Sequence, residues 1–229
     1  MATTKKNKKV QPVEQEIKKY YSLKRILKEE ADYNFIFGER SNGKTYSVED
    51  YALEDFALHG NQLGIVRRWD EDFRGKRGQE MFSALVNNGL VEKYTKGKWT
   101  GIYYYSARWY LCKYENDKRV IDSEPFAYAF SINAMEHDKS TSYPKIKTIL
   151  FDECMTREGY IPNEFVIFMN IVSTIVRDRG DVKIFMLGNT VDQHCIYFKE
   201  FGLRNALKMK QGDIDVYRYG DNELKVAIE

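Results

Sequence analysis

The chain has 229 residues, of which 36 are Lys or Arg and 34 are Asp or Glu, so its net charge at pH 7 is only +2. This balance excludes a uniformly basic coat, and any contact with nucleic acid must therefore use a local patch. Hydrophobic residues make up 43% of the chain and only 4 residues are proline. This composition argues against a largely disordered chain and favours one domain with a substantial core.

The cysteines and histidines are too few and too scattered for a metal centre or a disulfide framework. The three cysteines, Cys112, Cys154 and Cys195, form no C-x-x-C pair. His194 and Cys195 are adjacent, but a metal site needs more ligands. The apolar runs are too short to span a membrane, and the first residues lack the apolar stretch of a signal peptide. We therefore expect no membrane contact and a reducing, cytoplasmic setting.

The first half of the chain alternates between strand and helix signals. Residues 1–12 are predicted to be a flexible basic tail, with nucleic-acid contact as the alternative. The pattern then predicts a helix over 13–31, a buried strand YNFIFG and a helix after SNGKT that stops at Gly60. A strand NQLGIVRRW and a polar helical segment over 70–88 follow.

The second half begins with a strand-rich segment over 91–132, in which we expect two or three antiparallel strands. They would form an insertion or an edge extension of the main sheet. Its aromatic residues favour strand packing over base stacking; they are Trp99, Tyr103, Tyr104, Tyr105, Trp109 and Tyr110. The remaining pattern predicts a strand KTILF, a helix over 162–178, a strand VKIFMLGN, a helix over 196–203 and a hairpin over 213–229. Such alternation predicts an α/β fold with a mainly parallel sheet.

The most specific motif lies between the first predicted strand and the helix that follows it. It matches G-x-x-x-x-G-K-[ST] in full, as Gly38, Glu39, Arg40, Ser41, Asn42, Gly43, Lys44 and Thr45. The backbone N–H groups of such a loop surround phosphates, and the helix N-terminus adds its positive dipole end. We therefore assign ATP binding to all eight residues. Lys44 would reach the β and γ phosphates, and the Thr45 hydroxyl would bind Mg²⁺.

Two carboxylates follow the strand KTILF directly. Asp152 would hold Mg²⁺ beside Thr45, and Glu153 would orient and deprotonate the attacking water. An acidic helix cap is the alternative for this pair. A small-molecule kinase would not need Glu153, and the sequence has no motif for an acceptor pocket. The Asp-Glu pair therefore favours ATP hydrolysis.

Asn189 follows the strand VKIFML. If that strand is parallel to the one before Asp152, Asn189 reaches the same carboxyl edge of the sheet, where ligands bind. It would then contact the γ phosphate or the attacking water, with a plain turn residue as the alternative. Arg67 and Arg68 end another strand near this edge. They would sense phosphate, touch DNA or form an ordinary surface pair.

Arg177 and Arg179 stand at the end of the helix predicted over 162–178. This helix would be roughly 25 Å long at 1.5 Å per residue, so its end would lie at the sheet edge away from its own nucleotide. An arginine finger there would have to act on a neighbouring subunit. Spacing alone favours the alternative, in which both side chains stay in solvent at the helix C-terminus.

Together these segments resemble the DNA-packaging ATPases of phi29-like small tailed phages. The stretches that carry the resemblance are FIFGERSNGKTYS, GIVRRW, TSYPKIKTILFDECMTREGYIPNEF, IVRDRG and FMLGNT. They cover roughly residues 30 to 205 in matching order. The resemblance implies a three-layer P-loop ATPase of the ASCE type over 13–229. It assigns the phosphate and Mg²⁺ roles to Lys44, Thr45 and Asp152.

The resemblance also implies roles between subunits. Glu153 takes the catalytic role, and Arg177 falls on the position of the trans-acting arginine finger, with Arg179 the second candidate. Lys139 matches a basic residue at the subunit interface. The implied assembly is a homomeric ring, a pentamer in this family.

The function implied is ATP-driven translocation of double-stranded DNA through the portal into an empty procapsid. The motor would act in the cytoplasm of the infected bacterium, docked transiently on the procapsid; a structural RNA stays open as a further component. The nucleic-acid domain that follows in the family is expected to be absent from this chain. The alternative function is a non-motor, nucleotide-dependent switch or binding module that hydrolyses ATP slowly.

Overall fold

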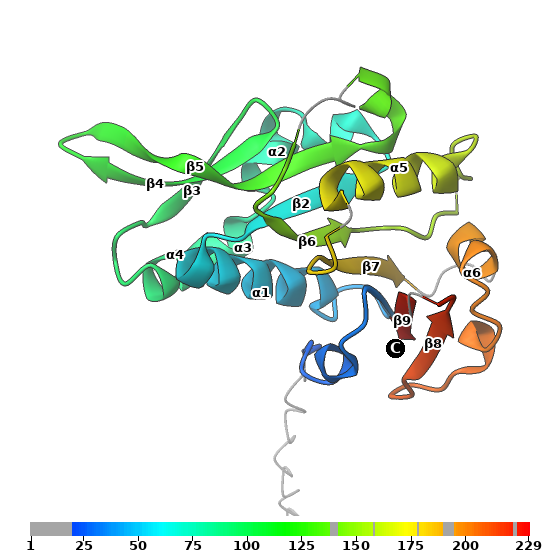
Figure 1. Cartoon of the computed structure of the whole chain (residues 1–229). Helices are drawn as coiled ribbons and strands as arrows, with labels where there is room; N and C mark the ends of the chain where they lie inside the picture. Colours follow the sequence, from blue (N-terminus) through cyan, green and yellow to red (C-terminus); the bar gives the residue numbers. More distant parts are fainter. Residues whose placement is uncertain (1–19, 138–141, 158, 178, 190–194, 222–223) are drawn as a thin grey trace, which may run out of the picture.

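A single large sheet forms the centre of the molecule (Figure 1). The computed structural model describes residues 20–137, 142–157, 159–177, 179–189, 195–221 and 224–229. Within them, nine strands pair in the order β3-β4-β5-β2-β6-β7-β1-β9-β8. The strands are β1 Tyr33–Gly38, β2 Gln62–Arg67, β3 Gly101–Tyr105, β4 Arg108–Glu115, β5 Lys118–Ser131, β6 Ile146–Phe151, β7 Lys183–Asn189, β8 Asp215–Tyr219 and β9 Leu224–Ile228.

The middle of the sheet is parallel and its two margins are antiparallel. Each neighbouring pair from β5 through β2, β6, β7 and β1 to β9 is parallel. At one margin β3, β4 and β5 pair antiparallel, and at the other margin β8 and β9 do so. The mainly parallel α/β sheet, its antiparallel extension and the C-terminal hairpin predicted from the sequence are thus confirmed.

Helices cover both faces of the sheet and make three layers (Figure 1). They are α1 Lys44–His59, α2 Gly75–Glu80, α3 Ser83–Asn87, α4 Leu90–Tyr94, α5 Glu164–Val176 and α6 Ile196–Glu200, with 3-10 turns at Ile26–Glu29, Asp70–Phe73, Ile132–His137 and Ala206–Lys208. One apolar core lies between the sheet and α1, α3 and α4, and the other lies between the sheet and α5 and α6.

The central strands read as continuous apolar runs because both of their faces are buried. On β1, Phe35 enters the core under α5 and α6, whereas Ile36 enters the core under α1; both are completely buried. Helix α1 ends where predicted, since Gly60 adopts a left-handed φ of 74° and its N–H caps the carbonyl of Phe56. No helix among the described residues is long and apolar enough to cross a bilayer.

The helix predicted over 13–31 is wrong for the residues that the structure describes. Of its span, 13–19 lie outside the described residues and only Ile26–Glu29 form a short 3-10 turn. The Tyr21 N–H donates to the carbonyl of Asn42, and the Tyr21 carbonyl accepts from the Ser47 hydroxyl. These contacts replace intrahelical bonds. The basic tail predicted over 1–12 also lies outside the described residues.

Two further boundaries differ from the prediction. Helix α5 spans 13 residues, Glu164–Val176, and not 162–178, because Asn163 and Arg177 adopt left-handed conformations at its two ends. The segment 91–132 begins within helix α4 and then forms β3, β4 and β5, which extend the edge of the main sheet.

Most of the aromatic segment packs as predicted, but part of its surface is exposed. Trp109 is completely buried and donates from Nε1 to the carbonyl of Gly78 at 2.7 Å, and Trp99 is also buried. Tyr103 and Tyr105 stack with ring centroids 6.4 Å apart, and Tyr105 is exposed. The two tryptophans therefore belong to the core, whereas one face of β3 carries tyrosines at the surface.

Candidate active site

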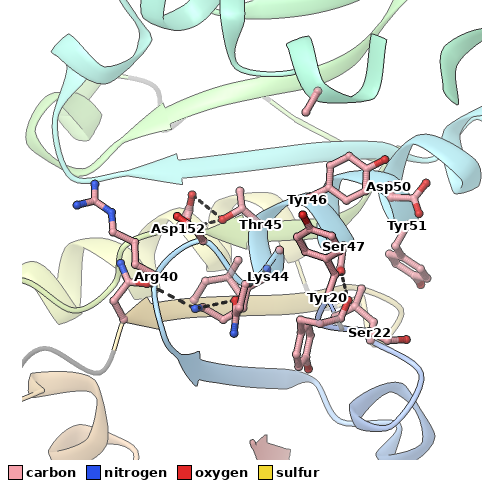
Figure 2. Close-up of a pocket in the computed structure, with 18 of the residues that line it drawn as sticks. Tyr20, Ser22, Arg40, Lys44, Thr45, Tyr46, Ser47, Asp50, Tyr51 and Asp152 are labelled. Carbon is pink, nitrogen blue, oxygen red and sulfur yellow. Dashed lines mark hydrogen bonds between the residues drawn. The ribbon is translucent and has the colours of Figure 1, made fainter. Parts of the chain in front are cut away.

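A cleft of about 1130 Å³ opens at the carboxyl edge of the parallel strands (Figure 2). Residues 40–45 of the loop 38–45 line one side of it, between β1 and the first turn of α1. Asp152 and Glu153 follow β6, and Asn189 ends β7, so all three also reach the cleft. Parallel strand direction therefore brings together the three motifs that the sequence separates.

The loop 38–45 curls around the amine of Lys44. Gly43 adopts a left-handed φ of 89° just before α1 begins, a conformation that a glycine adopts without steric cost. The Lys44 Nζ donates to the carbonyls of Gly38 at 3.2 Å and Glu39 at 2.8 Å, and to Asn42 Oδ1 at 3.1 Å. Burial lowers the pKa of Lys44, and the Asp152 carboxylate partly offsets this shift. The loop thus holds a buried cation at the mouth of the cleft.

Thr45 and Asp152 meet across the cleft. The Thr45 hydroxyl lies 3.3 Å and 3.2 Å from the two carboxylate oxygens of Asp152. A hydroxyl and a carboxylate are oxygen ligands of the kind that Mg²⁺ prefers, and Mg²⁺ sites commonly combine one or two protein oxygens with substrate phosphates and water. No group of three or more His, Cys, Asp or Glu residues among the described residues forms an all-protein metal cage. The donor set therefore fits a nucleotide-bound Mg²⁺.

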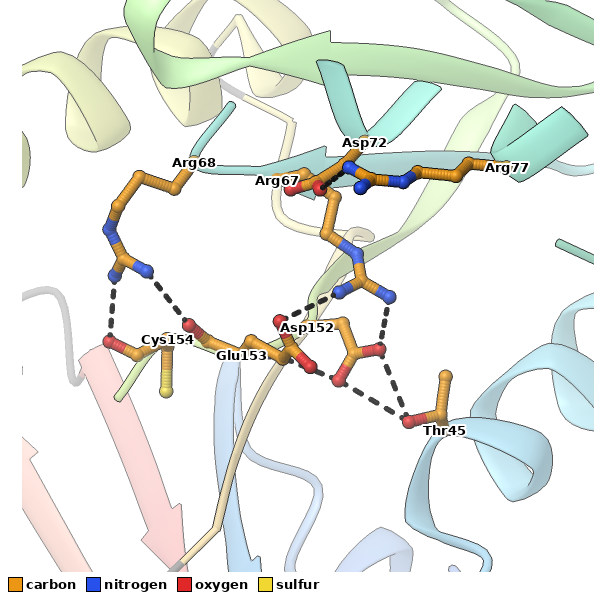
Figure 3. A network of polar contacts seen from close by, with 8 residues as sticks. All are labelled: Thr45, Arg67, Arg68, Asp72, Arg77, Asp152, Glu153 and Cys154. Carbon is orange, nitrogen blue, oxygen red and sulfur yellow. Dashed lines mark hydrogen bonds and ion pairs between the residues drawn. The ribbon is translucent and has the colours of Figure 1, made fainter. Parts of the chain in front are cut away.

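Arg67 bridges the two carboxylates after β6 (Figure 3). From the end of β2, its guanidinium lies 2.7 Å from Asp152 and 3.2 Å from Glu153. The Arg67 side chain is 18% exposed and that of Glu153 is 56% exposed. The sequence left Arg67 as a phosphate sensor, a DNA contact or a surface residue. Its position beside Asp152 and Glu153 favours the interpretation as a phosphate sensor.

Asn189 lies beside the loop because β7 pairs with β1. Gly38 and Asn189 are in register in this parallel pair. The Asn189 Oδ1 accepts from the Lys44 Nζ at 3.5 Å. Asn189 is thus placed next to the lysine and at the carboxyl edge, as its position after the strand led us to expect.

The two arginines after α5 lie at the opposite edge of the sheet. Arg179 donates to the carbonyl of Ile146, the first residue of β6, whereas Asp152 follows the last residue of that strand. Arg177 caps α5 and is exposed. Neither arginine lines the cleft of its own chain. The candidate Lys139 lies outside the described residues.

Arg179 makes structural contacts at the end of α5 and the start of β6. Its side chain is 23% exposed, and its guanidinium donates to backbone carbonyls around the start of β6 and the end of α5. These are the carbonyls of Tyr143, Pro144, Ile146, Ile175 and Val176. This geometry favours a role for Arg179 in fixing the helix end.

Sequence reasoning missed a buried carboxylate that interacts with Asp152 and Arg67. Glu49 lies one helical turn after Thr45 on α1 and is 5% exposed. Burial, and then the Asp152 carboxylate, raise the pKa of Glu49 well above its usual value, whereas Arg67 opposes the shift. The signal was present in the i, i+4 spacing from Thr45, which puts both side chains on one helix face.

The other end of the cleft is lined by tyrosines and polar side chains (Figure 2). Tyr20 and Tyr21 line it from the segment before the first 3-10 turn, and Tyr46, Asp50 and Tyr51 line it from α1. A Cβ at Gly43 would lie 3.3 Å from the Tyr20 ring. The cleft therefore joins a cationic, carboxylate-lined end to an aromatic end.

Comparisons with known proteins agree with this architecture. The family described as podovirus DNA encapsidation protein (Gp16) matches residues 16–218. The DNA packaging protein of Bacillus phage B103 is 28% identical over 173 residues, which cover 74% of this chain and 48% of that protein. The chain thus spans about half the length of the curated relative it matches.

Solved structures share the fold. The N-terminal domain of the DNA packaging ATPase from bacteriophage phi29 is 25% identical with a TM-score of 0.70, and the match covers 92% of this chain and 95% of that chain. A chain of the bacteriophage phi29 viral genome packaging motor assembly is 24% identical with a TM-score of 0.66. That match covers 92% of this chain and 57% of the other, and it speaks for the fold alone.

Proposed function

Because the chain belongs to the podovirus DNA encapsidation protein (Gp16) family, we propose that it is the ATP-hydrolysing part of a motor that moves double-stranded viral DNA into an empty procapsid. One observation carries this proposal: a basic loop, two carboxylates and an amide converge at one cleft. They are Lys44, Thr45, Asp152, Glu153 and Asn189.

Each of these residues has a role that follows from its position. Lys44 and the N–H groups of its loop bind the β and γ phosphates. Thr45 and Asp152 hold Mg²⁺, which neutralises phosphate charge when bound. Glu153, exposed at the cleft, accepts the proton of the attacking water. Asn189 orients that water or the γ phosphate.

The aromatic end of the cleft takes the nucleoside. Tyr20 lies against Gly43 and is 68% exposed, so its ring is accessible for contact with a base. On α1, the Tyr46 hydroxyl accepts from Asn88 at 2.9 Å, and Asp50 accepts from the Tyr94 hydroxyl at 2.7 Å. The Tyr46 hydroxyl and the Asp50 carboxylate are hydrogen-bonding groups for a base and a ribose. The bound nucleotide would then run from Asp152 to the tyrosines.

The working unit is a homomeric ring, a pentamer by resemblance, in which Arg177 completes the site of the neighbouring subunit. Two observations support this arrangement: Arg177 lies away from its own cleft, and the related phi29 chain comes from a packaging motor assembly. Lys139 is a second candidate at the same interface. The partners are double-stranded DNA and the portal of a procapsid in the host cytoplasm, and a structural RNA stays open as a further component.

The rate of ATP hydrolysis per subunit, measured across protein concentration, tests this proposal. The motor predicts a rate per subunit that rises as rings assemble and rises further with double-stranded DNA and portal-bearing procapsids. A slow rate that does not depend on protein concentration, DNA or procapsids would instead favour the alternative function, a nucleotide-dependent switch. An absence of hydrolysis under every condition would contradict the ATPase assignment itself.

A further inference from the structure

Arg68 contacts a buried carboxylate on one side and the backbone after β6 on the other; Figure 3 shows its contacts to Glu153 and Cys154. It follows β2, is 7% exposed and contacts Glu164, the first residue of α5, through two hydrogen bonds of 2.7 Å. Glu164 has no exposed side-chain surface and also accepts from the Tyr197 hydroxyl at 2.8 Å and from the Ile161 N–H at 2.9 Å. Both oxygens of this buried carboxylate are therefore doubly hydrogen-bonded.

The other edge of the Arg68 guanidinium holds the backbone at the catalytic glutamate. Its Nη1 donates to the carbonyl of Glu153 and its Nη2 donates to the carbonyl of Cys154, each at 3.2 Å. The Cys154 N–H in turn donates to the carbonyl of Leu187 on β7 at 2.9 Å. Two successive carbonyls and one N–H are thus fixed immediately after β6.

This fixation matters because Glu153 has an unusual backbone conformation. Its φ is 59°, in the left-handed region that costs a non-glycine residue energy unless the surroundings hold it. The side chain itself is 56% exposed, so packing does not fix its direction. The Arg67 guanidinium contacts the carboxylate at 3.2 Å, and the hydrogen bonds from Arg68 add a constraint on the backbone.

We propose that Arg68 is a positioning residue for ATP hydrolysis, which holds the Glu153 backbone so that the carboxylate faces the attacking water. The proposal rests on the proposed function, since it needs Glu153 to act as the base. A planar guanidinium has the geometry for this task, because one edge binds a carboxylate in a bidentate manner while the remaining N–H groups reach two carbonyls. A lysine ammonium is a point charge and does not reproduce both sets of contacts.

A purely structural role is the competing explanation. Buried ion pairs are weak sources of stability, because the cost of removing both charges from water offsets their attraction. Replacement of the whole pair by apolar residues of similar size is often tolerated, whereas loss of one partner leaves a buried charge. Arg68→Lys and the paired change Arg68→Met with Glu164→Leu therefore separate the two explanations.

The experiment measures kcat, ATP affinity and thermal unfolding for the full chain. For Arg68→Lys and for the Arg68→Met, Glu164→Leu pair, we expect kcat to fall by roughly 10²-fold, the cost of a small misplacement of a catalytic group. ATP affinity should stay within about twofold, because Arg68 does not line the cleft. Gln62→Met is the matched control. It removes a buried hydrogen bond to Pro125 at the other end of β2, and it should lower stability without lowering kcat.

A second comparison tests whether Arg68 acts through Glu153. In a Glu153→Gln background, Arg68→Lys should reduce the residual rate by less than twofold, because residues that act as one unit are not additive. The proposal is overturned if either Arg68 variant folds and keeps the wild-type kcat, or if the two losses multiply. Failure of both variants to fold would assign the network to folding alone and also overturn it. A wild-type chain without ATPase activity would reject the proposed function instead.

Discussion

At the residue scale, Lys44 is the cation that the proposed phosphate site needs. Its Nζ is held by three acceptors of the loop 38–45 and lies beside Asn189. Lys44→Ala removes this charge from the β and γ phosphates. We expect loss of ATP binding by isothermal titration and loss of turnover, with the thermal unfolding midpoint nearly unchanged. Wild-type ATP affinity in the folded variant would disprove the assignment of the loop.

Glu153 is the proposed general base. Glu153→Gln fills the same space, but its amide cannot take the proton of the attacking water. General-base contributions are roughly 10² to 10⁴-fold, so we expect a loss of that size in single-turnover hydrolysis with ATP binding retained. A neighbouring exposed change on the same loop, Arg157→Gln, is the control and should leave the rate unchanged. Unaltered turnover in Glu153→Gln would move the catalytic role elsewhere.

The sequence predicted the cleft residues of the three motifs but not the side chains that surround them. The G-x-x-x-x-G-K-[ST] spacing is specific because the loop must curl around phosphate. The Asp-Glu pair was recognisable because it directly follows a buried strand, whose end lies at the carboxyl edge of the sheet. Arg68 and Glu164 have no such pattern, since their partners lie on other strands and helices. Their contacts depend on tertiary packing that one sequence does not reveal.

At the scale of elements, strands were easier to predict than helix ends. The parallel strands are short, nearly continuous apolar runs, as expected for strands buried on both faces. The ends of α5, by contrast, depend on left-handed residues at Asn163 and Arg177, which side-chain periodicity does not indicate. The segment over 20–25 lacks helix because its backbone bonds to Asn42 and Ser47. Here tertiary contacts outweigh a helical charge pattern.

The end of α5 also carries a stability prediction. Arg179 donates to five backbone carbonyls, so Arg179→Ala should lower the free energy of unfolding by about 1–3 kcal/mol, as expected when buried acceptors lose their donor. Arg157→Ala, which removes an exposed arginine from the loop after β6, is the matched variant and should leave stability nearly unchanged. Urea unfolding of both variants checks this contrast. Equal stabilities would reject the structural role of Arg179.

At the scale of the whole molecule, the two ends of α5 lie near opposite edges of the sheet. Its first residue, Glu164, belongs to the network behind Glu153, and Arg177 follows its last residue at the far edge of the sheet. We propose that such a chain builds most of one site from its own residues and contributes Arg177 to the site of another copy. The account therefore predicts that activity belongs to an assembly and not to one subunit.

The central claim is that neighbouring subunits of a ring share each ATP site, and subunit mixing tests it most directly. Lys44→Ala removes a subunit's own phosphate cation, and Arg177→Ala removes the finger, worth roughly 10³ to 10⁵ in rate. Each variant alone should be inactive, and Arg177→Ala should still bind ATP. When they are mixed and co-assembly is shown by cross-linking, some interfaces combine an intact Lys44 with an intact Arg177, and ATPase activity should partly return. Mixed rings that stay inactive at every ratio, or normal hydrolysis by Arg177→Ala alone, would contradict the account.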